Sequence, residues 1–238
     1  AAAALARRGA QVRLGNPVQR LRRTDAAWTI EVRGALHDFE AVVLALSPER
    51  AADLLASAAL PALGPLVDEL SAIEMAPIAT VYLRYAASVR LPWPACALLD
   101  APAAGRFGQW AFARGALDAD NAGVVSVVVS AAQQAVQIGA DALAASVAAQ
   151  LEADLGLPAP LATAVVMEKR ATIVPAPGLR RPPSRLPVAG LYLAGDAADS
   201  DYPSTLEGSV RAGLAAAQAL AHDIGRKLSV GAARAYLI

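Results

Sequence analysis

The sequence predicts a mixed fold of the α/β class with α+β character, in which strands and helices alternate near both ends and a mostly antiparallel sheet occupies the middle. Three patterns predict it: short β-leaning runs between turn signals in residues 11–46, longer β-rich segments in residues 78–131, and a buried strand followed by a glycine-containing helix in residues 190–221. The chain has 238 residues, of which 56% are hydrophobic. It is therefore long and apolar enough to bury a sizeable core.

The first sixty residues are expected to form a helix, several short strands and two further helices. An alanine-rich start favours a helix that ends at Gly9. Turn signals separate the predicted strands, which cover residues 11–14, 18–23, 28–33 and 39–46. The last of these contains the wholly apolar run AVVLAL, which is typical of a strand buried on both faces. Ser47 as N-cap and Pro48 at the first helical position predict a helix to about residue 58, and a second helix follows Pro61.

The middle of the chain is predicted to form one mostly antiparallel sheet. Its expected strands lie within residues 78–85, 95–101, 106–114 and 123–131. Leucine and valine recur every four residues over 141–155, which predicts a helix with one apolar stripe. A strand is expected over 163–174, and the proline-rich connector 176–190 lacks the periodicity of either regular element.

Composition excludes several classes of function. Twenty-one basic residues balance 21 acidic ones, so the chain lacks the positive charge of a general nucleic-acid binder. The single cysteine, Cys96, cannot form an internal disulfide, and no Cys/His pair has zinc-ligand spacing, so we expect a small core cysteine, a reducing compartment and no metal. No apolar run reaches the roughly 18–20 residues of a membrane span. We expect a cytoplasmic location, with peripheral contact at the inner face of the membrane left open.

The most informative segment is residues 190–221. The strand LYLAGD ends in Gly195 and Asp196, which places a carboxylate at the carboxyl edge of a strand, where open α/β sheets bind ligands. A helix is expected to begin near Thr205. One of its faces carries Leu206, Val210, Leu214, Ala217, Ala221 and Ile224. Small residues that allow close approach of a backbone or a flat ligand occupy another: Gly208, Ala212, Gly213 and Ala216.

A strand, a Gly-Asp pair, a loop and a helix start together favour an anion or polar-edge site, because free N–H groups and the helix dipole attract negative charge. A reduced flavin carries such charge around N1 and the C2 carbonyl, and its stabilisation would favour hydride chemistry at N5. An ordinary βα unit explains the same spacing equally well, with the aspartate as a cap and the glycines serving only packing.

The run LYLAGDAADSDYPSTLEGSVRAGLAAA resembles the C-terminal FAD-binding signature of the flavin amine oxidase and phytoene desaturase superfamily. More narrowly, EKRATIVPAPGLRRPPSRLPVAGLYLAGD and YPSTLEGSVRAG are similar to the squalene-associated FAD-dependent desaturases, also called hydroxysqualene dehydroxylases. Upstream, the passages RRGAQVRLGNPVQRL, FEAVVLALSPERAADLL and PIATVYLRY through GQWAFARG support the narrower match.

The resemblance implies six residues that contact FAD. Gly195 and Asp196 would meet the pyrophosphate and the ribityl chain. Ser204, Thr205 and Leu206 would place backbone N–H groups against the pyrimidine edge of the isoalloxazine ring.

The sixth implied contact is Val18, which would meet the adenine end through its backbone. Amine oxidases often carry an aromatic residue at the position of Thr205, and its absence here argues against amine oxidation. The resemblance implies no catalytic side chain that can be named.

The same resemblance implies a partial two-domain flavoprotein. Residues 1–60 and 160–225 would belong to the FAD-binding domain and 76–158 to the substrate-binding domain, while the N-terminal dinucleotide-binding unit with its GxGxxG turn is absent from these residues. The implied reaction is reductive dehydroxylation of hydroxysqualene to squalene by reduced FAD, with an apolar isoprenoid substrate. The alternatives are a flavin amine oxidase, a carotenoid desaturase, a protoporphyrinogen oxidase-like enzyme or a truncated non-catalytic remnant.

Two groups of side chains have open interpretations. Four aromatic residues of the middle region line either an apolar substrate tunnel or an ordinary core: Trp93, Phe107, Trp110 and Phe112. Three arginines of the connector either attract a diphosphate or an anionic lipid surface or lie on a solvated loop: Arg180, Arg181 and Arg185.

Overall fold

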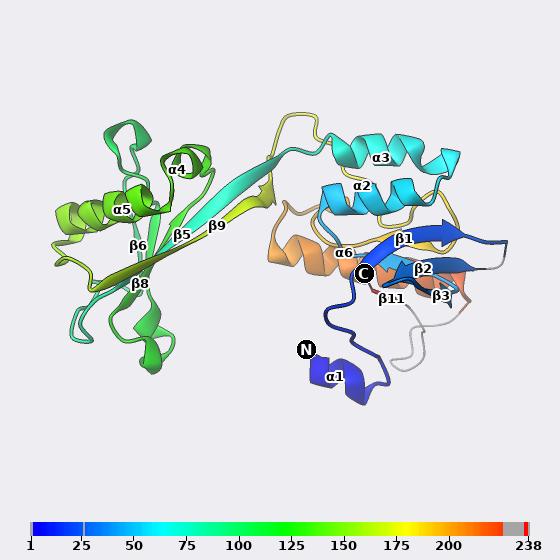
Figure 1. Cartoon of the computed structure of the whole chain (residues 1–238), viewed down its shortest axis with the longest axis horizontal. Coiled ribbons are helices and arrows are strands. Elements are labelled where there is room, and N and C mark those ends of the chain that lie inside the picture. The colour runs from blue at the N-terminus through cyan, green and yellow to red at the C-terminus, as the bar shows by residue number, and fades with distance from the viewer. Residues whose placement is uncertain (1, 26, 226–235, 238) are drawn as a thin grey trace. The chain divides into compact units, whose positions relative to one another are not determined.

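The computed structural model describes residues 2–25, 27–225 and 236–237 and divides the chain into two compact units (Figure 1). Unit 1 comprises Ala1–Glu74 and Pro175–Ile238, and unit 2 comprises Met75–Val174. The mixed fold with antiparallel sheets agrees with the predicted fold class. Residues 162–173, which the sequence-based division placed in the first domain, pair with a strand of unit 2.

The described residues of unit 1 form two small sheets and four α-helices. Its elements are α1 (Ala2–Arg7), β1 (Val18–Arg23), β2 (Trp28–Val32), β3 (Ala35–Phe39), β4 (Val42–Leu44), α2 (Pro48–Ser57), η1 (Pro61–Leu63), α3 (Gly64–Ser71), β10 (Leu191–Leu193), α6 (Leu206–Asp223) and β11 (Tyr236–Leu237). Strands β1, β2 and β3 form an antiparallel meander, whereas β4 lies between β10 and β11 and is parallel to both. The short parallel sheet positions the loop that follows β10.

The connector between residues 176 and 190 is irregular, as predicted, but it is anchored in unit 1. The indole Nε1 of Trp28 donates to the carbonyl oxygen of Ala189 at 3.0 Å, and Val42 N donates to the carbonyl of Gly190 at 2.8 Å. Gly190 has a φ of +76°, and a Cβ there would meet the carbonyl oxygen of Glu40 at 2.7 Å. Only glycine therefore fits this crossing.

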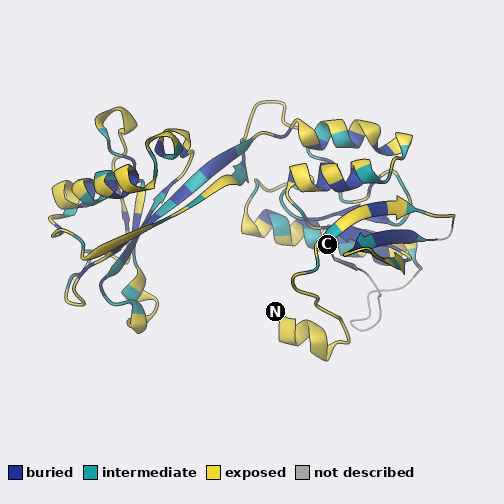
Figure 2. Cartoon of the chain, in the orientation of Figure 1, coloured by how far each residue is buried: buried dark blue, intermediate teal, exposed yellow. Residues whose placement is uncertain are grey.

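Unit 2 is a five-stranded antiparallel sheet with helices on one face. Its elements are β5 (Met75–Arg84), β6 (Ala95–Ala97), η2 (Pro102–Ala104), β7 (Trp110–Ala113), η3 (Arg114–Ala116), η4 (Ala119–Asn121), β8 (Val124–Val129), α4 (Gln133–Ile138), α5 (Ala140–Leu155) and β9 (Ala162–Ile173). The strand order is β6-β7-β8-β5-β9. Figure 2 shows α5 buried along one side and exposed along the other, and its Leu143, Val147 and Leu151 are fully buried as predicted.

The two faces of the unit 2 sheet differ. One face packs against α4 and α5 and holds the core of the unit, including Val81, Val127 and the predicted core cysteine Cys96. Because directly opposite residues of antiparallel strands share a face, the register places two rows on the other side. They are Ala97, Trp110, Val128, Thr80 and Val166, and Ala95, Phe112, Ser126, Tyr82 and Ala164. Trp110 is 49% exposed and Val166 59% exposed. We call these two rows the open sheet face.

Several predicted elements changed. Residues 11–14 form no strand, because they are exposed and pair with no other described strand, so the alternating pattern alone did not produce one. Strand β3 was missed, since its sequence ALHDF carries His37 and Asp38 at its centre and lies mostly exposed, and it becomes a strand through pairing with β2. The short helix α4 was missed as well. Helix α2 begins at Pro48 as predicted, although the Ser47 side chain makes no capping hydrogen bond.

Candidate functional site

The carboxyl end of β10 opens into the loop of residues 194–205. All three residues of β10 are buried, and Ala194 N extends the parallel pairing by donating to the carbonyl of Leu44 at 2.7 Å. Gly195 then turns the chain with a φ of +90°, and no atom lies within 4 Å of the position that a Cβ would take. The side chain of the half-buried Asp196 makes no hydrogen bond or ion pair with another described residue. The end of the strand is therefore followed by an open turn and by a carboxylate that has no described hydrogen-bond or ion-pair partner.

The far end of the loop is the start of α6, an 18-residue helix. Thr205 is extended, with φ −135° and ψ 170°, and its Oγ1 accepts a hydrogen bond from Gly208 N at 3.1 Å, as an N-cap does. The first N–H groups of a helix lack intrahelical acceptors. Within residues 2–25, 27–225 and 236–237, the N–H groups of Leu206 and Glu207 have no acceptor. Two free donors thus point out of the positive end of the helix dipole.

Arg181 ties the two ends of this loop together. Its Nη1 donates to the carbonyl oxygen of Asp196 at 3.2 Å. Its Nη2 donates to the carbonyl oxygens of Ser200 at 2.9 Å and Tyr202 at 2.8 Å. Of the two interpretations of the connector arginines, the solvated loop does not describe Arg181. Sequence reasoning missed its role because bonds from a side chain to carbonyl oxygens leave no residue pattern.

The two predicted faces of α6 have different environments. The small residues pack: Gly208, Ala212 and Ala216 are buried. By contrast, the aliphatic stripe is exposed over the first turns, with Leu206 89%, Val210 59% and Leu214 59% exposed. A Cβ on Gly208 would meet the carbonyl oxygen of Pro203 at 2.5 Å, so the predicted close approach is to the protein's own loop.

Val18 lies apart from the other five predicted contact residues in the topology. It is the first residue of β1, pairs with Val32 and precedes an irregularity in the register. Its strand belongs to the meander, whereas Gly195 and Asp196 follow β10 of the other sheet. Gly195, Asp196, Ser204, Thr205 and Leu206 share one loop and helix start. The adenine contact of Val18 stays a prediction.

The opposite end of α6 carries a polar cluster. Tyr192 Oη donates to Asp223 Oδ2 at 2.8 Å, and Arg185 Nη2 lies 2.8 Å from Asp223 Oδ1. Burial, aided by the bond to Asp223, raises the pKa of Tyr192 to about 12. The same hydrogen bond lowers the pKa of Asp223 below its ordinary value. These groups fasten β10, the connector and the end of α6 to one another, which assigns Arg185 a structural role.

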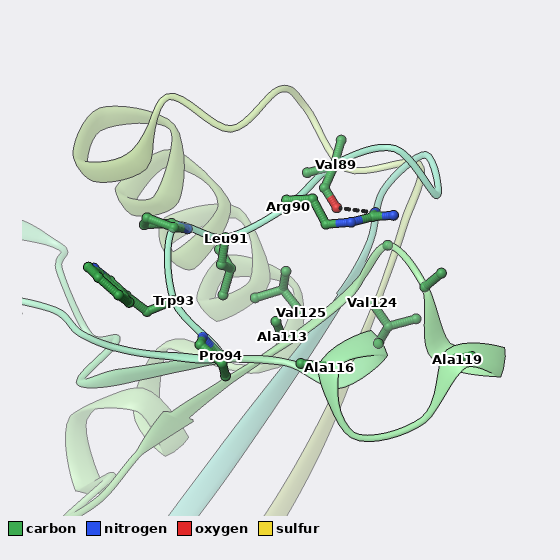
Figure 3. Close-up of a pocket in the computed structure, with 14 residues that line it drawn as sticks. Val89, Arg90, Leu91, Trp93, Pro94, Ala113, Ala116, Ala119, Val124 and Val125 are labelled. Atoms are coloured by element: carbon green, nitrogen blue, oxygen red, sulfur yellow. Dashed lines mark hydrogen bonds between the residues drawn. The ribbon is translucent and has the colours of Figure 1, made fainter.

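A separate cavity of about 420 Å³ lies within unit 2 (Figure 3). Its walls are mostly apolar and include Leu91, Pro94 and Val125, while the Arg90 side chain at its edge donates to the carbonyls of Ala87 and Val89. None of the six predicted contact residues lines it. In the part of the chain that the structure describes, no three His, Cys, Asp or Glu side chains gather as a metal site would require.

The four aromatic residues with open interpretations lie in different environments. Phe107 is 6% exposed and belongs to the core of unit 2. Trp110 and Phe112 lie on the open sheet face with ring centroids 6.4 Å apart. Trp93 is 70% exposed on the loop beside the cavity.

Residues 1–221 match the family model of the flavin-containing amine oxidoreductases. The chain belongs to this family. Membership implies FAD as the cofactor. No curated protein matches the chain at a significant level.

Several solved structures share the fold of this chain. A candidate protoporphyrinogen oxidase from Exiguobacterium sp. 255-15 superposes with a TM-score of 0.64 at 17% identity, over 91% of this chain and 48% of that one. Cyclohexylamine oxidase from Brevibacterium oxydans IH-35A superposes with a TM-score of 0.63 at 16% identity, over 88% of this chain and 49% of that one. An oxidoreductase from Methanosarcina mazei superposes with a TM-score of 0.60 at 16% identity, over 87% of this chain and 49% of that one. The chain thus spans about half the length of these structures. Among the described residues, no helix is long and apolar enough to cross a membrane.

Proposed function

We propose that this chain supplies the C-terminal part of an FAD site, with the loop after β10 and the start of α6 as its contacts. The chemistry of the free groups supports this. The N–H donors of Leu206 and Glu207 suit the carbonyl-bearing, electron-rich edge of the flavin pyrimidine ring, and Ser204 and Thr205 lead into them. The carboxylate of Asp196 suits the hydroxyl groups of the ribityl chain. The open space at Gly195 suits the close approach of the pyrophosphate.

The proposed reaction is the reductive dehydroxylation of hydroxysqualene to squalene. Reduced FAD, when bound, supplies the hydride that, with one proton, replaces the hydroxyl group by hydrogen and releases water. The exposed α6 start would stabilise negative charge on the reduced cofactor, which favours the reduced state that the reaction consumes. None of the described side chains is assigned as the proton donor.

The observation that carries the substrate class is the open sheet face. It presents Trp110, Phe112, Tyr82 and Val166, and the charged side chains of Arg84 and Glu168 lie in the rows that flank it. A long hydrocarbon gains roughly 25 cal/mol for each Å² of apolar surface removed from water. An apolar isoprenoid is therefore the substrate that this face suits best.

The decisive assay incubates the full-length enzyme with hydroxysqualene and reduced FAD without oxygen, and identifies the product by mass spectrometry. Squalene formed in proportion to flavin oxidised is the expected result. Trp110→Asp should raise KM strongly, because it places a charge on the open sheet face. Leu117→Asp is the matched control, since Leu117 is 77% exposed but lies outside the sheet, and it should leave KM unchanged.

The second candidate is another flavin oxidoreductase of the same superfamily, acting on an amine, a carotenoid or a porphyrinogen. The names of two solved relatives favour it, one a candidate protoporphyrinogen oxidase and the other a cyclohexylamine oxidase. Turnover of one of these substrates without squalene formation would select it. A non-catalytic remnant is the third candidate, and a purified chain that stays colourless after addition of FAD would support it.

We further propose that the protein is cytoplasmic, with contact at the inner face of the membrane as the variant to be tested. Flotation with anionic vesicles separates the two, because only a membrane-bound protein rises with the lipid.

A further inference from the structure

Arg181 is more firmly placed than its proline-rich surroundings predict. The segment around it is fixed by backbone bonds, since Asp199 N donates to the carbonyl of Pro182 at 2.7 Å and Leu193 N to that of Ser184 at 2.8 Å. These bonds hold the connector alongside both β10 and the loop that follows it. The Arg181 side chain therefore starts from a fixed backbone and loses little further freedom when it enters the loop.

One guanidinium closes the loop at both ends. Its Nη1 binds the carbonyl of Asp196, one residue after Gly195, while its Nη2 binds the carbonyl of Tyr202, three residues before the N-cap Thr205. The planar fork of arginine can serve acceptors on two sides at once, which a lysine ammonium on its flexible stem does less well. Through this single side chain, the turn after β10 and the start of α6 are held in one arrangement.

The bonds also set the direction of the loop peptides. In a planar trans peptide, the carbonyl of one residue and the N–H of the next point in opposite directions. Carbonyls of Asp196 and Ser200 that face Arg181 turn the N–H groups of Ala197 and Asp201 away from it. Tyr202 precedes Pro203, whose nitrogen carries no hydrogen, so that peptide offers only an acceptor, which Arg181 and the Ser200 hydroxyl both reach.

We propose that Arg181 is a positioning residue for FAD. It acts through the loop, by presenting the Asp196 carboxylate and the free N–H groups of α6 together, and not by touching the cofactor. This inference rests on the proposed flavin role of the loop. It predicts that changes at Arg181 alter flavin binding and the flavin environment, even where the protein remains folded.

The test compares three variants of the full-length enzyme. Arg181→Met removes all three hydrogen bonds, and Arg181→Lys keeps the charge but cannot hold both ends of the loop. Arg180→Met is the matched control, because Arg180 is exposed and pairs with no described residue. Apoprotein Tm is measured first, and FAD affinity, visible flavin spectrum and midpoint potential are measured at a temperature where every variant is folded.

The expected result is a loss of about tenfold or more in FAD affinity for Arg181→Met, a tenfold change being 1.4 kcal/mol. The flavin spectrum and potential should shift, Arg181→Lys should recover only part of the affinity, and Arg180→Met should match wild type. Wild-type affinity, spectrum and potential in both Arg181 variants would overturn the proposal and leave the flavin function standing. An equal loss in Arg180→Met would overturn it too. Failure of the wild-type enzyme to bind FAD would overturn the proposed function, and this inference with it.

Discussion

Two glycines of α6 should respond in opposite ways to the same substitution. Gly208 and Gly213 both lie within the helix, where alanine is favoured over glycine by about 1 kcal/mol. At Gly213 no atom lies within 4 Å of an added Cβ, so Gly213→Ala should gain most of that amount. At Gly208 the Cβ would lie 2.5 Å from the carbonyl oxygen of Pro203, which is a backbone atom and cannot rotate away.

The magnitude for Gly208→Ala follows from what must move. Overpacking costs about 1–3 kcal/mol. Displacing Pro203 also strains the N-cap bond that the N–H of residue 208 donates to Thr205 Oγ1, and losing such a cap costs about 1 kcal/mol. After subtraction of the gain in helix propensity, the free energy of unfolding of unit 1 should fall by about 2 kcal/mol. At roughly 3 °C per kcal/mol for a chain of this size, Tm should fall by about 6 °C in Gly208→Ala and rise by about 3 °C in Gly213→Ala.

Unit 1 can be followed by itself through its tryptophan. Of the three tryptophans in the chain, Trp28 is fully buried in unit 1, while Trp93 and Trp110 belong to unit 2. Thermal unfolding is therefore measured by tryptophan fluorescence in a background with Trp93→Phe and Trp110→Phe. If Gly208→Ala melts at or above the temperature of Gly213→Ala, the close approach to the loop is wrong.

Three further changes test other parts of the structure. Leu206→Pro should keep the Tm, since proline suits the first helical position, but should weaken FAD binding because it removes a free N–H. Leu206→Ala should keep both the Tm and the FAD affinity. Equal flavin titrations for the two variants would contradict this prediction. Gln150→Leu should cost unit 2 about 2 kcal/mol in urea unfolding, because it leaves the buried N–H and carbonyl of Gly108 unpaired, and a near-neutral result would contradict that pairing. Tyr192→Phe should destabilise unit 1 at pH 7. A raised tyrosine pKa gives stability that is present below pH 10 and lost toward pH 12, so the deficit should shrink over that range in denaturant titrations, and a constant deficit would refute the role of the Tyr192–Asp223 bond.

The elements that were predicted correctly carry their signals in local sequence. Helix α2 starts where Pro48 can start a helix, and α6 starts after Thr205, whose hydroxyl caps it. Strand β4 is apolar throughout and all three of its residues are buried, and a run of valine and leucine predicts such burial on both faces. In each case the deciding interaction lies within a few residues.

The elements that were missed depend on distant partners. Residues 11–14 alternate as a strand does but pair with no other described strand, whereas β3 is mostly exposed and forms because it pairs with β2. The site divides in the same way. The strand end at Gly195 and the helix start near Thr205 were predicted from local spacing, but the bonds of Arg181 join residues 15 to 21 positions apart through carbonyl oxygens, which any residue type carries.

The discontinuity of unit 1 sets an order for folding during synthesis. Among the described strands, β4 pairs with β10 and β11, and Trp28 Nε1 donates to a carbonyl oxygen 161 residues later. At about 5–20 residues per second, the ribosome takes about ten to thirty seconds to supply those partners. Unit 2 is continuous and can complete its sheet in that interval, while the apolar β4 waits with both edges unpaired. Chaperone dependence should therefore concentrate on residues 1–74 while the later part of unit 1 is still being synthesised.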